Sequence, residues 1–96
     1  MESRLAEDLM KLLRAELPEH RYLLVMHCGA RQWEALYDQA HKLHGSAAYC
    51  KQSELANGAA ALERAASAAD EQAIAQALET TLHEIDSVLA ADGRSA

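Results

Sequence analysis

Apolar residues recur at helical spacing along almost the whole chain, and little in the sequence interrupts them. Near the start, Leu5, Leu9, Leu12 and Leu13 fall on one stripe of a helix. The 96 residues include one proline and four glycines, so few positions force a helix to end. Frequent alanine also favours helix over sheet. We therefore predict an all-α chain without strands.

The periodicity predicts five helical segments, beginning with a short helix over about residues 3–16. Pro18 fits the first turn of a second helix, because its missing N–H is not needed there, and Gly29 is a candidate C-terminal cap for that helix. A third segment covers about residues 30–49. The fourth begins near Gln52 or Ser53, and Asp70 is a candidate N-cap for the last.

Short connections between amphipathic helices favour antiparallel neighbours. The predicted architecture is therefore an antiparallel four-helix bundle with an additional short N-terminal helix over one end. It forms a single domain over residues 1–96, with helices over about 3–91 and a polar tail at 92–96.

The charge balance excludes several classes of partner. A formal net charge of −6 is unsuited to nucleic acid or to an anionic membrane surface, both of which need clustered Lys and Arg. No apolar run approaches the roughly 20 residues that span a bilayer, and charged residues interrupt any signal-peptide pattern near the N-terminus.

Cys28 and Cys50 do not form a disulfide framework, so we expect a reduced, cytoplasmic protein.

The most informative stretch is Ala-His-Lys-Leu-His-Gly-Ser, residues 40–46, within the third predicted helix. Ala40 and Leu43 belong to its apolar stripe. His41 lies about 100° around the helix from Ala40, on a flank that solvent can reach. His44 and Gly45 follow it on the same face, and Asp38 lies one turn before it.

Gly45 is unexpected inside a helix, where glycine costs about 1 kcal/mol relative to alanine. A glycine one turn beyond an exposed histidine leaves a notch beside the imidazole, which a phosphoryl group or a docking partner could occupy. Lys42 and His44 add positive or potentially positive charge nearby. A neutral imidazole nitrogen is a competent nucleophile at neutral pH, which makes His41 a candidate acceptor.

This stretch resembles the phosphorylation motif A-H-x-L-K-G-S of histidine-phosphotransfer (HPt) domains. Within that family it is most similar to the C-terminal HPt domains of BarA/GacS-type hybrid sensor kinases, which share the His-Lys-Leu-His-Gly core and a tyrosine at the position of Tyr49. The leucine-rich first helix, the Trp33-x-x-Leu36 spacing and the later Leu62-Glu63 pair extend the likeness to about residues 5–90.

The resemblance implies that His41 carries the phosphoryl group in a two-component phosphorelay, with receiver-domain aspartates as donor and acceptor. It implies that Gly45 provides clearance and that Lys42 and His44 flank the phosphate, with Asp38 and Ala48 on the docking face. Such a domain has no ATP site and no cofactor of its own, because the receiver supplies Mg²⁺. It is commonly a monomer.

Two positions depart from the family pattern. His44 stands where a lysine is usual, so phosphate stabilisation, and with it transfer, would depend on protonation of His44. Lys51 stands where a glycine usually eases the turn between the third and fourth helices, so that loop could differ in shape.

Two other interpretations fit parts of the sequence. His41 and His44 could share a metal with Cys28 or Cys50, although the cysteines lack zinc-finger spacing. A helical bundle that only binds another protein accounts equally well for the amphipathic stripes. It does not account for a mid-helix glycine beside an exposed histidine.

Overall fold

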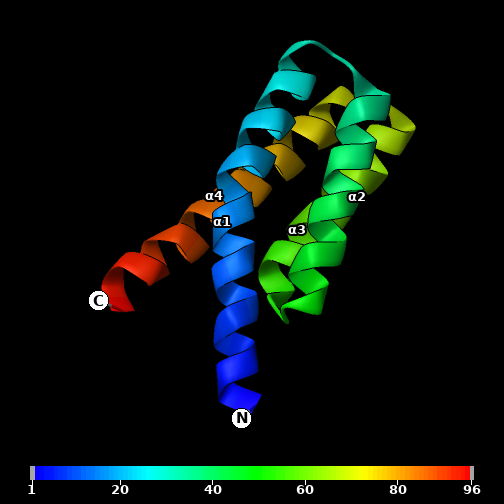
Figure 1. The fold of residues 1–96 in the computed structure, drawn as a ribbon. Helices are drawn as coiled ribbons and strands as arrows, with labels where there is room; N and C mark the ends of the chain where they lie inside the picture. The colour runs from blue at the N-terminus through cyan, green and yellow to red at the C-terminus, as the bar shows by residue number, and fades with distance from the viewer. Residues whose placement is uncertain (1, 96) are drawn as a thin grey trace.

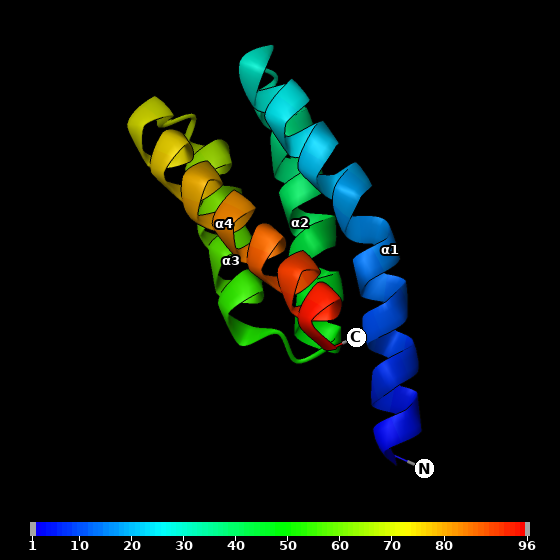
Figure 2. The ribbon, with the colours of Figure 1, turned by 90° about the vertical axis from the view of Figure 1, so that its left-hand side faces the viewer.

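The computed structural model describes the backbone of residues 2–95 and the side chains of residues 4–91. It contains four helices: α1 (Glu2–Gly29), α2 (Trp33–Tyr49), α3 (Ser53–Ala68) and α4 (Glu71–Ser95). They run alternately up and down, so that both termini and the α2–α3 loop lie at one end (Figure 1 and Figure 2). The described residues form no strand, which confirms the all-α bundle.

The predicted short N-terminal helix is wrong, because α1 continues without a break through Pro18. Leu13, Leu17 and Leu24 are all buried, and they lie on one face only if the helix keeps its register across the proline. Burying each leucine contributes about 1.5–3 kcal/mol, and together they outweigh the roughly 3 kcal/mol cost of an internal proline. The first turns of α1 extend past the end of the bundle (Figure 1).

The core lies along the bundle axis and is built from leucine and alanine. Its large fully buried residues come from all four helices: Leu13, Leu17, Leu24, Leu36, Leu43, Leu55, Leu62, Ile74, Thr81 and Ile85. Buried alanines such as Ala40, Ala47 and Ala59 let neighbouring helices approach closely. α2 and α3 therefore lie side by side along their length (Figure 2).

The first three helices are each followed by a residue in the left-handed conformation, and none of these three residues is a glycine. Arg31, Lys51 and Ala69 adopt left-handed φ values of 57°, 59° and 52°. After α1, the N–H of Gln32 bonds to the carbonyl of His27 and that of Arg31 to Cys28, which is a Schellman motif. The expected cap at Gly29 is therefore wrong, since the left-handed residue comes two positions later. Lys51 adopts the left-handed conformation that glycine favours. The turn between α2 and α3 therefore forms although lysine stands where the family usually has glycine.

The ends of α4 are also defined. The side chain of Asp70 accepts a hydrogen bond of 3.2 Å from the N–H of Ala73, which confirms Asp70 as N-cap. The backbone of α4 remains helical through Ser95, into the segment predicted as a tail; Ala96 and the side chains beyond Ala91 lie outside the described residues.

None of the helices described is long and apolar enough to cross a membrane.

Candidate functional site

His41 projects from the middle of α2, and its side chain is 66% exposed. Its neighbours Ala40 and Leu43 are completely buried, so the core fixes the rotation of α2 about its axis. This agrees with the exposed flank predicted from helical spacing. The ring therefore projects from the surface of α2, where it is accessible to a partner.

A carboxylate from the neighbouring helix holds the ring. Nδ1 of His41 lies 3.2 Å from one oxygen of Glu63 on α3, and Nδ1 of His44 lies 3.0 Å from the other oxygen. The Glu63 side chain is 17% exposed, far less than either imidazole. One largely buried carboxylate thus contacts both histidines of the motif.

The ionisation of Glu63 determines the tautomer of His41. Burial alone would raise the pKa of the Glu63 carboxyl, but hydrogen bonds and charge from His41 and His44 outweigh it and lower that pKa below its usual value. A carboxylate only accepts hydrogen bonds, so a neutral His41 ring must carry its proton on Nδ1. The lone pair then lies on Nε2, the nitrogen that does not face Glu63.

Tyr37 stacks against the ring of His41. Its ring is nearly parallel to that of His41, with an interplanar angle of 4° and centroids 6.1 Å apart. This offset stacking lies one helical turn before His41. Together, Tyr37 and Glu63 restrict the rotamers of a side chain that solvent would otherwise leave free.

Gly45 leaves open space beside His41. A Cβ built at this position meets nothing within 4 Å, and the residue is in ordinary helical conformation. No contact within the described residues therefore explains why alanine, the better helix former, is absent. Packing within the part of the chain that the structure describes therefore gives no reason for a glycine at this position.

The other predicted site residues surround this open position. Asp38 and Ala48 are both exposed on α2, before and after His41. Lys42 is exposed on the flank nearer α1, where it borders a hollow shared with Glu16, Glu19 and His20. His44 lies on the other flank, against α3. The structure therefore places Lys42 and His44 on opposite sides of the His41 face.

A second histidine, His20, is buried and lines the same hollow as Lys42. It is 8% exposed, and its Nδ1 lies 2.7 Å from the amide nitrogen of Gln39, which donates to it. Burial lowers the pKa of His20 despite the nearby Glu16. A neutral, buried ring of this kind is a structural group and not an accessible nucleophile.

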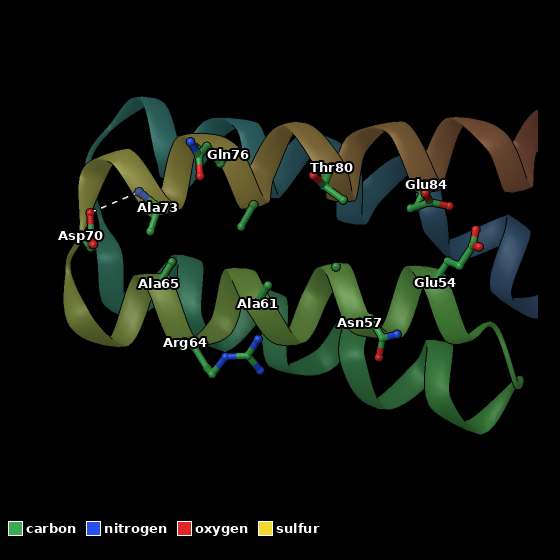
Figure 3. A pocket seen from close by; sticks show the side chains of 12 residues that line it. Glu54, Asn57, Ala61, Arg64, Ala65, Asp70, Ala73, Gln76, Thr80 and Glu84 are labelled. Atoms are coloured by element: carbon green, nitrogen blue, oxygen red, sulfur yellow. Dashed lines mark hydrogen bonds between the residues drawn. The ribbon is translucent and has the colours of Figure 1, made fainter.

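The structure also describes a groove away from His41. A groove of about 670 Å³ between α3 and α4 is lined mainly by small residues and bordered by side chains such as Glu54, Arg64 and Glu84 (Figure 3). It shares no residue with the His41 site. Residues 4–91 contain no group of three or more His, Cys, Asp or Glu side chains that could hold a metal. The alternative of a metal shared with Cys28 or Cys50 thus has no structural support.

Sequence reasoning did not assign Glu63 a role. It lies 22 residues from His41 on another helix, so only the packing of α3 against α2 brings them together. A weak signal was available, since Glu63 directly follows the buried Leu62 and had to lie at the edge of that interface.

The fold and the site define a class: an all-α bundle that presents one exposed, carboxylate-bound histidine beside a mid-helix glycine. A family model described as Hpt domain matches residues 7–91, and the chain therefore belongs to the Hpt domain family. No curated protein and no solved structure matches it. Family membership makes the chain a histidine-phosphotransfer module of phosphorelays, not a kinase with its own ATP site.

Proposed function

We propose that this chain is a phosphorelay intermediate in which His41 accepts a phosphoryl group from the aspartate of one receiver domain and donates it to the aspartate of a response regulator. One observation carries the choice of His41: it is an exposed imidazole whose Nδ1 faces the partly buried carboxylate of Glu63, next to the open position at Gly45. His20 is buried, so it is excluded as the acceptor.

The chemistry uses Nε2 of His41 as the nucleophile. Nε2 attacks the phosphorus of the aspartyl phosphate in line, the P–O bond breaks, and the receiver regains its carboxylate. The proton on Nδ1 stays in its hydrogen bond to Glu63, which stabilises the positive charge that develops on the ring. The reverse reaction passes the group to the next aspartate.

The partner contributes the remaining groups. The receiver would supply the aspartate, the Mg²⁺ and a charge-stabilising lysine, and this chain would supply the histidine and its surroundings. The docking face is centred on Gly45 and includes Asp38, Lys42 and Ala48, all exposed on α2. We expect the reaction to take place in the reduced cytoplasm, with a hybrid sensor kinase of the BarA/GacS type as the partner.

The test is incubation with a phosphorylated receiver domain and Mg²⁺, followed by intact mass before and after acid. We expect wild type to gain one phosphoryl group that acid removes, because phosphoramidates are acid-labile. His41→Gln should gain none while keeping its helical circular dichroism. His83→Gln, which changes an exposed histidine on α4, is the matched control and should behave as wild type.

Uptake by His41→Gln would disprove the assignment of His41. Absence of uptake by wild type from several receivers would instead favour the interpretation of a helical bundle that only binds other proteins.

A further inference from the structure

The ring of Tyr37 lies between the core of the bundle and the exposed imidazole of His41. The Tyr37 side chain is half-buried and packs against the hydrophobic core. Its ring plane lies within 4° of that of His41, with the two centroids 6.1 Å apart. The His41 side chain is 66% exposed, so solvent alone would leave it free to move. Tyr37 is therefore fixed by packing, and His41 stacks against a ring that is itself held in place.

Tyr37 and Glu63 restrain different parts of the imidazole. The carboxylate of Glu63 contacts one atom at the ring edge, since its oxygen lies 3.2 Å from Nδ1. That distance is at the long end of the range for a hydrogen bond from nitrogen to oxygen, and a single bond of this kind leaves the ring free to tilt. Tyr37 contacts the face of the ring, so the stacking restricts the tilt that the hydrogen bond does not.

We propose that Tyr37 is a positioning residue for phosphoryl transfer, whose ring holds the His41 imidazole in the orientation that meets the phosphorus in line. This inference rests on the proposed function of His41. It deepens that function by naming a residue that acts through His41 without contacting the phosphoryl group. Its role is therefore in the rate of transfer within the docked complex and not in the affinity for the receiver.

The size of the effect follows from the orientations open to a free histidine. Two of the three staggered χ1 rotamers are common in a helix, and the ring torsion has about two preferred values. An unrestrained imidazole therefore spends roughly a quarter of its time in any one orientation. In-line transfer requires the reacting atoms to be aligned, so only that fraction reacts. Because Glu63 still contacts the ring, loss of the stacking should slow transfer by about 2- to 4-fold.

The test is single-turnover transfer from one phosphorylated receiver with Mg²⁺, measured over a series of receiver concentrations. Tyr37→Leu keeps an apolar side chain against the core and removes the ring. We expect its rate at saturating receiver to fall by about 2- to 4-fold, with the half-saturating concentration unchanged. Tyr37→Phe keeps the ring and should transfer as wild type does.

Trp33→Leu is the matched control for lost packing. Trp33 is also a half-buried aromatic residue of α2 packed against the core, but its ring lies under the guanidinium of Arg31. We therefore expect Trp33→Leu to lower stability without slowing transfer per folded molecule.

A second measurement needs no phosphate. Three-bond NMR couplings about the Cα–Cβ bond of His41 report its χ1 rotamers in the unphosphorylated protein. We expect one rotamer in wild type, Tyr37→Phe and Trp33→Leu, and averaged couplings in Tyr37→Leu.

The two proposals fail differently. If wild type takes no phosphate from several receivers, the proposed function is wrong, whatever the couplings show. If wild type is phosphorylated but Tyr37→Leu keeps its saturating rate or its single His41 rotamer, only the role of Tyr37 is refuted. A higher half-saturating concentration at an unchanged saturating rate would refute it too, because Tyr37 would then contact the receiver. An equal loss of rate in Trp33→Leu would attribute the effect to packing and would also refute it.

Discussion

Gly45 and Gly58 both lie inside helices, and each carries the same intrinsic cost of about 1 kcal/mol relative to alanine. Their surroundings differ. A Cβ at Gly58 would lie 3.2 Å from Oγ1 of Thr81 and 3.5 Å from its Cα, whereas a Cβ at Gly45 would meet nothing within 4 Å. Gly58 therefore allows α3 and α4 to approach closely, while Gly45 has no packing contact of this kind, which is why we propose that it serves a docking partner. A glycine inside a helix indicates function only after packing has been excluded as its cause.

The largest expected effect is at Gly45. Gly45→Arg places a long side chain over His41, and we expect transfer from a phosphorylated receiver to fall by about 100-fold or more, because in-line geometry tolerates little displacement. Thermal unfolding should be unchanged or slightly higher. Gly29→Arg is the matched control, since a Cβ there also meets nothing within 4 Å but lies at the end of α1. Equal transfer rates for the two variants would remove the case for docking at Gly45.

The opposite result is expected at Gly58. Gly58→Leu forces α3 and α4 apart, and overpacking of this kind costs about 1–3 kcal/mol of unfolding free energy. Denaturant unfolding gives that value. The rate of phosphoryl transfer per folded molecule should remain that of wild type, because the groove side of α3 is remote from His41. An unchanged unfolding free energy would show that the α3–α4 contact is loose.

The smallest substitution sharpens the comparison. We expect Gly45→Ala to stabilise the protein by up to about 1 kcal/mol, the full gain in helix propensity, while slowing transfer. Gly58→Ala should gain less or lose, since its methyl must displace Thr81. Gly58→Ala combined with Thr81→Ala leaves room for the methyl, so the two changes should couple favourably in a double-mutant cycle. Identical single-mutant effects would contradict the distinction drawn between the two glycines.

The structure also contains a position where glycine would suit the backbone conformation but another residue is present. Ala69 has a left-handed φ of 52°, which costs a residue with a Cβ roughly 1 kcal/mol. Ala69→Gly should therefore raise the unfolding free energy by about 0.5–1 kcal/mol, since the gain exceeds the added entropy of the unfolded chain. A lower stability measured by urea unfolding would show that the terminus of α3 is not strained.

Much of the fold could be predicted from the sequence, because helix periodicity and the cap at Asp70 are local signals. Pro18 misled the prediction, since burial of Leu13, Leu17 and Leu24 is a tertiary effect that overrides a local one. For the site, the motif gave His41 and Gly45, and the spacing correctly predicted their exposure. The role of Glu63 could not be predicted, because the contact with His41 depends on which face of α3 packs against α2.

The continuous α1 also determines where local unfolding of the bundle begins. Pro18 cannot donate the hydrogen bond that residue 18 of an uninterrupted helix would make, and the turns before it carry Leu5 and Leu12 at 62% and 61% exposure. Few buried contacts protect that end, so its amide protons should exchange with deuterated solvent far sooner than those of α2 and α3. Fraying would then begin at the N-terminus and reach the helices that hold His41 and Glu63 only on global unfolding, which keeps the acceptor geometry intact during local fluctuations.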